Sequence, residues 1–231
     1  TEIIESNMRL SLYRRHFIAA SLFIAAAGLS LTGIVAHASA KNMSSQPKTI
    51  LVIGDSLSAE YGLKRGSGWV ALLKSKLDDE KQHATIINAS MSGDTTSGGR
   101  ARLGALLQQH RPSHVIIELG ANDALRGLPL QFTEDNLTQM TQAAQKSGAK
   151  VLLVGMQVPP NYGKAYNDRF AGLFAQVAKT NQAGLVPFLL KGIADRANST
   201  QLFQADRIHP NEEAHPIMLG NVWPELRKLL K

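Results

Sequence analysis

The sequence of 231 residues contains no cysteine. Disulfide bonds and lipid attachment to a thiol are therefore excluded, and the core alone must hold the fold together. The sequence also lacks G-x-x-x-x-G-K-[ST] and G-x-G-x-x-G, the phosphate-binding loops of most nucleotide enzymes. The G-x-S-x-G pattern of α/β-hydrolases is absent too, because Ser58 stands where its second glycine would be. We expect no cofactor and no metal.

Charge and aromatic residues are sparse, at 19% and 6% of the chain, and the net charge is +7. Residues 1–40 carry three arginines and two glutamates, so all but one unit of this charge lies beyond them. The basic residues are scattered and form no block interleaved with aromatic residues, so we expect no nucleic-acid partner. A basic surface is compatible with peripheral contact with anionic phospholipids, or with no partner at all.

The N-terminal part has the order of a secretory signal peptide. A stretch with three arginines is followed by an apolar run at residues 17–36 and by an A-x-A pattern that ends at Ala40. We predict upstream residues and a signal peptide in 1–40, cleavage near Ala40, and one domain in 41–231 that is periplasmic or secreted. An uncleaved membrane anchor remains the alternative. General secretion fits the very apolar run better than twin-arginine export does.

Short apolar runs alternate with helix-like segments along the rest of the chain, and continuous apolar runs are typical of parallel strands covered on both faces. The expected strands are Thr49–Ile53, Ala84–Ala89, His114–Leu119, Lys150–Gly155 and Gly184–Phe188. The expected helices are Trp69–Leu77, Arg100–Gln109, Thr133–Lys146, Tyr166–Lys179, and a last one within Pro210–Leu230 that starts near Met218. This alternation predicts an α/β fold: a three-layer α/β/α sandwich with a five-stranded, mostly parallel sheet. We expect a monomer.

Three residues in the loops after these strands have the types needed for nucleophilic catalysis. Ser56 follows the first strand, and Asp206 stands three residues before His209 near the end of the chain. A serine hydroxyl needs a base to take its proton, and an Asp-x-x-His spacing lets the carboxylate orient the imidazole of that base. Because loops at the carboxyl ends of parallel strands meet in one crevice, we expect these residues to converge.

An acyl-transfer enzyme must also stabilise an oxyanion. Candidate donors are the backbone amides of Ser56 and Gly93 and the side-chain amide of Asn122. Each residue taken alone also has a structural interpretation: Ser56 would cap a helix, and the others would be turn residues. Their expected joint position at one edge of the sheet favours the catalytic interpretation over the structural one.

This joint pattern resembles the GDSL or SGNH hydrolase family. The matching residues are Ser56 in "GDSLS", Gly93 in "SGDT", Asn122 in "GAND", and His209 with Asp206 in "DRIH". The blocks look most like the periplasmic thioesterase, lysophospholipase and arylesterase branch. The resemblance implies a flavodoxin-like fold and metal-independent cleavage of small-molecule esters and thioesters, lysophospholipids and acyl-CoA among them.

The resemblance also implies an acyl-binding segment, "PPNYGKAY", which contains Pro160, Asn161 and Tyr162. The same residues could form a simple connection between a strand and a helix. Leu125 and Leu128 could bound the acyl groove or pack beneath their loop.

Glu60 and Ala121 occupy positions where related enzymes often carry glycine. This departure spares the expected catalytic residues, but it leaves the acyl-chain preference open.

Two other function classes remain open. Asp55, Asp94, Asn122 and His209 could be ligands of a metal-dependent phosphoesterase, although the several histidines expected of such a site are missing. A non-catalytic lipid- or carbohydrate-binding module could use the same fold.

Overall fold

The computed structural model describes residues 47–231. The predicted signal peptide, its cleavage near Ala40 and the alternative membrane anchor lie outside the described residues. Within residues 47–231, no helix has both the length and the apolar character needed to cross a membrane.

The centre of the fold is a sheet of five strands, all parallel, in the order β2-β1-β3-β4-β5. The strands are β1 (Lys48–Gly54), β2 (Ala84–Asn88), β3 (His114–Glu118), β4 (Lys150–Val154) and β5 (Gly184–Val186). Each predicted strand is therefore present. The last one is shorter than expected and ends before Pro187, whose missing N–H interrupts a hydrogen-bonded ladder.

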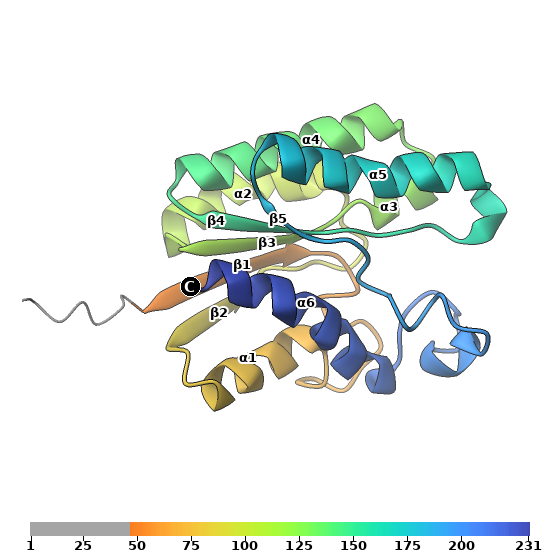
Figure 1. Ribbon diagram of the computed structural model, residues 1–231, viewed down its shortest axis with the longest axis horizontal. Coiled ribbons are helices and arrows are strands. Elements are labelled where there is room, and N and C mark those ends of the chain that lie inside the picture. The colour runs from red at the N-terminus through yellow and green to blue at the C-terminus, as the bar shows by residue number, and fades with distance from the viewer. Residues whose placement is uncertain (1–46) are drawn as a thin grey trace, which may run out of the picture. The chain divides into compact units, whose positions relative to one another are not determined.

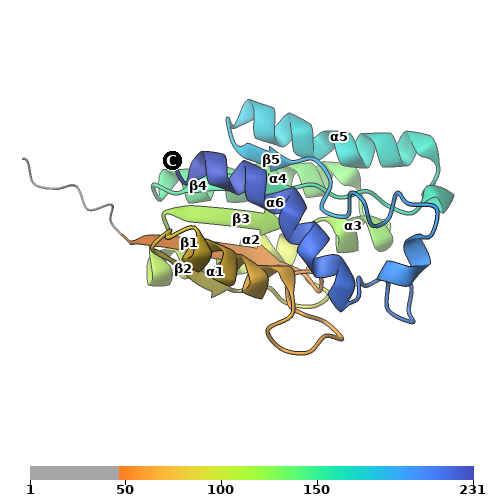
Figure 2. The same ribbon diagram turned by 60° about the horizontal axis from the view of Figure 1, so that its bottom comes forward.

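Helices cover both faces of the sheet. They are α1 (Trp69–Asp79), α2 (Thr96–His110), α3 (Ala121–Leu125), α4 (Leu130–Lys146), α5 (Lys164–Thr180) and α6 (His215–Leu229). Figures 1 and 2 show α1 and α6 together on one face and α2, α3, α4 and α5 on the other. The predicted three-layer α/β/α architecture is confirmed.

The predicted start of the second helix is wrong by four residues, because α2 begins at Thr96 rather than Arg100. The glycines in "TSGGR" argue against a helix by propensity. The Thr95 side chain, however, caps the helix by accepting a bond from the Gly98 amide at 3.3 Å. Gly99 packs closely against Leu119, since a Cβ at this position would overlap the Leu119 side chain.

The ends of three other helices also differ from the prediction. Helix α4 starts three residues early, α5 two residues early, and α6 starts at His215 rather than near Met218. The start of α6 fits its sequence, since Pro216 occupies the first turn, where a missing N–H costs nothing. Helix α3 was not predicted, because five residues carry too little periodicity.

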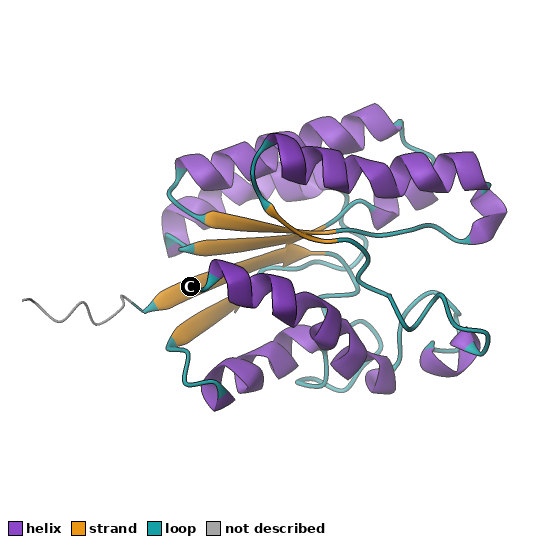
Figure 3. Cartoon of the chain, viewed as in Figure 1, coloured by secondary structure: helices purple, strands orange, loops and turns teal. Residues whose placement is uncertain are grey.

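Strands β1 and β3 form the centre of the core. Every residue from Ile50 to Gly54 and from His114 to Glu118 is buried. The strand order reverses between these two strands, which creates a crevice at their carboxyl ends. The loops after β1, β2, β3 and β4 all leave the sheet at this edge, on the right of Figure 3.

Candidate active site

Ser56 lies in a tight turn directly after β1. The amides of Ser58 and Ala59 both donate to the carbonyl of Asp55, at 3.2 and 2.9 Å. These bonds close a turn rather than a helix, so the interpretation of Ser56 as a helix cap is wrong. The turn leaves the Ser56 side chain partly exposed while its neighbours Asp55 and Leu57 are buried.

Ser56, His209 and Asp206 form one hydrogen-bonded line, although Ser56 and His209 are 153 positions apart in sequence. Nε2 of His209 lies 3.0 Å from Oγ of Ser56. Nδ1 of His209 lies 2.6 Å from Oδ2 of Asp206. The structure therefore brings together the three residues that the sequence singled out, with the imidazole between the hydroxyl and the carboxylate.

The second carboxylate oxygen of Asp206 fixes the turn that carries His209. Oδ1 accepts bonds from the backbone amides of Ile208 and His209, at 2.9 and 3.0 Å. Burial on its own would raise the pKa of Asp206, but these bonds and the contact with the His209 ring lower that pKa to about 2. Asp206 is thus a carboxylate at any ordinary pH and favours the Nδ1–H tautomer of His209.

The Gln204 side chain joins the loop that carries His209 to the turn that follows Ser56. Nε2 of Gln204 donates to the carbonyl oxygens of Tyr61 and Pro210, at 2.9 and 3.0 Å. The ring of Tyr61 also packs against the ring of His209, with centroids 4.3 Å apart. Neither Gln204 nor Tyr61 was singled out from the sequence, because a residue that acts through backbone carbonyls leaves no motif.

The two backbone amides proposed as oxyanion donors are available. Among residues 47–231, neither the Ser56 amide nor the Gly93 amide donates a hydrogen bond. Gly93 has a φ of +77°, a conformation that suits glycine far better than any other residue. Its carbonyl accepts a bond of 2.7 Å from Arg126, which anchors the loop after β2 to the loop after α3.

The amide of Asn122 is held differently from the prediction. Its Nδ2 donates to Oδ2 of Asp55 at 3.1 Å and to the carbonyl of Asp94 at 3.0 Å. Both N–H groups are therefore engaged, and an oxyanion would have to share one of them.

The next residue, Asp123, is buried and connects α3 to α2, because its carboxylate accepts a bond of 2.9 Å from the Thr96 amide.

Sequence reasoning missed a second carboxyl group in this region. Glu118 ends β3, directly beside Gly54 of β1, and is completely buried. Burial, and next the charge of Asp55, raise the pKa of Glu118 well above its usual value. Burial likewise raises the pKa of Asp55 to about 6, against bonds from Leu57 and Glu118 and the charge of His209. An acidic residue within the apolar run "HVIIEL" was the available signal.

Exposed apolar residues gather at the same edge of the sheet. In residues 47–231, the large exposed ones are Tyr61, Met91, Leu125, Leu128, Phe132, Tyr162 and Ile208. They lie in the loops that follow the strands, at the end of α3 and at the start of α4. Leu125 and Leu128 are 41% and 37% exposed, so the alternative that they pack beneath their loop is wrong.

The predicted acyl segment forms a short 3-10 helix, Pro160–Tyr162, between β4 and α5. Asn161 and Tyr162 are exposed. A cavity of about 580 Å³ lies on another side of the serine turn and includes Glu60 and Ser90 in its lining, but no member of this segment.

The backbone conformation at Glu60 is one that glycine adopts more easily than other residues. Its φ of +59° is strained for a residue with a side chain. The Glu60 carboxylate offsets this strain by accepting bonds from the amides of Gly66 at 3.0 Å and Gly68 at 2.8 Å, just before α1. Ala121 needs no such compensation, because it begins α3 in helical conformation.

The residues considered as metal ligands are engaged with protein groups instead. Oδ1 and Oδ2 of Asp55 accept bonds from Leu57 and Asn122, and Oδ2 of Asp94 accepts two bonds from Arg102. The described part of the chain contains no cluster of three or more acidic or histidine residues suited to a metal ion. This donor set does not fit a metallophosphoesterase.

A doubly wound α/β sheet with serine, histidine and aspartate in line at its carboxyl edge has the layout of a serine hydrolase. Residues 52–217 match the model of the GDSL-like Lipase/Acylhydrolase family. The chain belongs to this family, as its sequence blocks predicted.

Three relatives are similar over nearly their whole length. Esterase TesA from Pseudomonas aeruginosa is 49% identical over 79% of this chain and 90% of its own. Thioesterase 1/protease 1/lysophospholipase L1 from Escherichia coli K12 is 40% identical over 79% and 85%. A crystal structure of the psychrotrophic esterase EstA from Pseudoalteromonas, inhibited by monoethylphosphonate, has a TM-score of 0.74 and 42% identity over 79% and 98%. The chain is a carboxylic ester hydrolase that acts on small-molecule esters.

Proposed function

We propose that this chain cleaves aryl and alkyl esters, lysophospholipids and acyl thioesters such as acyl-CoA through an acyl-enzyme on Ser56. The observation that carries the proposal is the line from Oγ of Ser56 through His209 to Asp206, with distances of 3.0 and 2.6 Å. The phosphonate inhibition of the related esterase EstA supports it, because phosphonates react with activated serines.

In this mechanism, Oγ of Ser56 attacks the acyl carbonyl carbon while Nε2 of His209 takes the hydroxyl proton. The carbonyl oxygen becomes an oxyanion that accepts bonds from the amides of Ser56 and Gly93 and from Asn122. His209 then gives its proton to the leaving alcohol or thiol. A water molecule repeats these steps on the acyl-enzyme and releases the acid, while Asp206 stabilises the imidazolium.

The apolar residues at this edge fit the acyl chain of such a substrate. Leu125 and Leu128 lie on α3 and the loop after it, next to Asn122, and Tyr162 lies after β4. Together with Pro160 and Asn161, we assign them to acyl binding. The E. coli relative is a thioesterase and lysophospholipase by name, which supports lipid-derived substrates for this chain.

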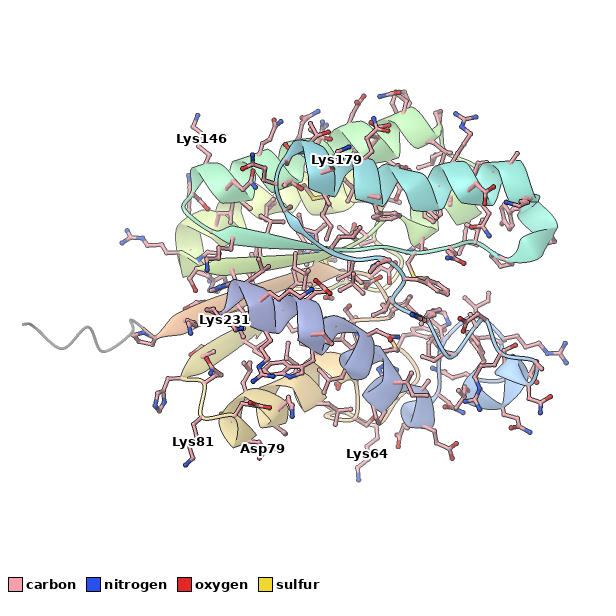
Figure 4. The ribbon with its side chains drawn as sticks, in the orientation of Figure 1. Lys64, Asp79, Lys81, Lys146, Lys179 and Lys231 are labelled. Carbon is pink, nitrogen blue, oxygen red and sulfur yellow. The ribbon has the colours of Figure 1, made fainter. Side chains whose placement is uncertain are left out.

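We also propose that the enzyme is periplasmic or secreted after removal of a signal peptide, and that it is a monomer. The order of basic, apolar and small residues before Ala40 supports export. The positive charge of the described chain is spread, since Figure 4 shows Lys64, Lys81, Lys146 and Lys231 well apart. Peripheral contact with a lipid surface would therefore rely on the apolar residues at the active-site edge.

A panel of p-nitrophenyl esters with acyl chains of increasing length tests the substrate assignment. We expect higher kcat/KM for medium and long chains than for acetate, because a longer chain buries more apolar surface against Leu125 and Leu128. Leu125→Ser and Leu128→Ser should lower the long-chain values about threefold to tenfold and leave acetate unchanged. Ala105→Ser on the exposed face of α2 is the control and should leave the values for all chain lengths unchanged.

Activity in this panel should be unaffected by EDTA, and a fluorophosphonate should label the peptide that contains Ser56. Loss of activity with EDTA, with Ser56 unlabelled, would contradict the proposed mechanism. Equal kcat/KM for all chain lengths would contradict the acyl assignment alone.

Asn122→Ala should lower kcat about 10²- to 10³-fold with little change in KM, because one oxyanion donor is lost. The measurement is steady-state hydrolysis of p-nitrophenyl acetate. Asn221→Ala is a matched control, since the Asn221 amide also bridges two carbonyl oxygens, those of Leu189 and Lys191. A near-normal kcat for Asn122→Ala would remove Asn122 from the oxyanion hole.

A further inference from the structure

Two buried carboxyl groups lie beneath the turn that carries Ser56. Glu118 is 0% exposed and Asp55 is 1% exposed. Within the described residues, neither group forms an ion pair. Two negative charges in such a place would be strongly unfavourable, so the pair must share a proton.

Glu118 is connected to the serine turn by two hydrogen bonds. Its Oε2 accepts a bond of 2.7 Å from Oγ of Ser58 and one of 3.3 Å from the amide of Asp55. Oγ of Ser58 in turn accepts a bond of 3.2 Å from the indole of Trp69. A Cβ at Gly54 would lie 2.8 Å from both Oε2 of Glu118 and Oγ of Ser58. The glycine of "GDSLS" therefore leaves the space that this bond occupies.

Asp55 connects Glu118 to the oxyanion donor. The Asp55 amide donates to Oε2 of Glu118 at 3.3 Å, and both side chains are buried, so a proton on one of them relieves the repulsion between the two carboxyl groups. Asp55 accepts N–H groups from Leu57 at 3.0 Å and from Asn122 at 3.1 Å, which stabilise its anion.

The proton belongs on Glu118 rather than on Asp55. Oε1 of Glu118 is buried and receives no hydrogen bond from the described residues. An ionised carboxylate with one bare oxygen is costly in a buried site, whereas a neutral acid needs fewer donors. The rise in the pKa of Glu118, caused first by burial and then by the charge of Asp55, agrees with this assignment.

We propose that Glu118 is a positioning residue for ester hydrolysis: as a neutral acid it donates to Asp55, and through Asp55 it orients the amide of Asn122. The inference rests on the proposed function, since it needs Asn122 as an oxyanion donor. A second effect passes through Ser58, which Glu118 anchors within the turn that presents Ser56. Oxyanion donors are effective only when held where the charge develops, and a buried chain of hydrogen bonds provides that restraint.

Two substitutions of Glu118 separate its hydrogen bonds from its volume. Glu118→Gln keeps a neutral group that can both accept from Ser58 and donate to Asp55, and should lose about threefold in kcat. Glu118→Met keeps a similar length without any hydrogen bond, and should lose roughly 50-fold in kcat, less than removal of the donor itself. KM for p-nitrophenyl acetate should stay within about twofold in both.

His114→Leu provides a control on the same strand. His114 begins β3, is 5% exposed, and its ring contacts the carbonyl of Leu229 far from the active-site edge. This variant should lower the melting temperature and leave kcat unchanged. A wild-type kcat in folded Glu118→Met, or no rescue of kcat in Glu118→Gln, would overturn the proposal.

A double-mutant cycle tests whether Glu118 acts through Asn122. In an Asn122→Ala background, Glu118→Met should cost less than about fivefold, because the amide that it orients is already gone. A full loss in that background would overturn the proposed path through Asn122. If Asn122→Ala itself keeps a normal kcat, Asn122 is not an oxyanion donor and the inference about Glu118 fails, whereas ester hydrolysis through Ser56 stands.

The proton on Glu118 has a readout that does not depend on activity or on the Met variant. Only the wild type takes up a proton at this position on folding, so its stability falls as pH rises above the unfolded pKa of glutamate. The melting temperature of Glu118→Gln relative to wild type should therefore rise between pH 5 and pH 7 by roughly 3–5 °C per pH unit. A difference that does not change with pH would show an ionised Glu118 and overturn the proposal.

Discussion

Ser56→Ala should lower ester turnover by about 10⁴-fold or more, since every other step depends on the nucleophile. The side chain of Ser56 makes one described contact, the 3.0 Å bond with Nε2 of His209. Loss of its oxygen should therefore leave the turn and the fold intact. The measurement is hydrolysis of p-nitrophenyl butyrate, together with the melting temperature and the rate of fluorophosphonate labelling.

Ser75→Ala is the matched control, because Ser75 is an exposed serine on α1. It should keep both the activity and the labelling of the wild type. A Ser56→Ala protein that still turns over ester at near-normal rate would contradict the acyl-enzyme mechanism. If the fluorophosphonate labels another residue of Ser56→Ala but the variant stays inactive, the acyl-enzyme mechanism is not contradicted.

Asp206→Asn should lower kcat by about 10³- to 10⁴-fold, the second-largest loss. An asparagine can still accept bonds from the amides of Ile208 and His209 through its carbonyl oxygen. Its NH2 group would then face Nδ1 of His209, which favours the tautomer with the proton on Nε2. That nitrogen, 3.0 Å from Ser56, could no longer take the serine proton.

To test this prediction, kcat is measured from pH 5 to pH 9 for Asp206→Asn and for the control variant Asp168→Asn. Asp168 is an exposed aspartate on α5, paired with Lys164, so its substitution should have no effect. Because the pKa of Asp206 is about 2, protonation of Asp206 should not shape the wild-type profile in this range. Less than a tenfold loss in Asp206→Asn would show that the backbone bonds alone orient His209.

The sheet and the family could be predicted from the sequence because both leave continuous signals. Runs such as "TILVI" are short, rich in β-branched residues and followed by a glycine, which favours a buried strand, and four blocks in a fixed order indicate the family. The helix starts were less predictable. Helix α2 begins within "TSGG", where local propensity opposes a helix and the packing of Gly99 against Leu119 decides.

The supporting residues of the site could not be predicted, for a different reason. Gln204 acts on two carbonyl oxygens that any residue provides. Glu118 acts on an aspartate and a serine that are 63 and 60 positions away. Their roles arise from strand order, which places β3 beside β1. The roles of Ser56, His209, Asp206, Gly93 and Asn122 stay predictions until the variants are measured.

The long sequence separation within the site determines when the site forms during folding. Ser56 and His209 are 153 positions apart, and strand β1 must acquire β3 as a neighbour before the crevice exists at all. In the proposed mechanism, the serine of a chain that is still being synthesised or is unfolded therefore has no base and does not attack esters. Ester hydrolysis should therefore begin only when the segment that carries Asp206 and His209 has docked against the turn of Ser56. The rate at which activity returns during refolding then reports the rate of this last docking step.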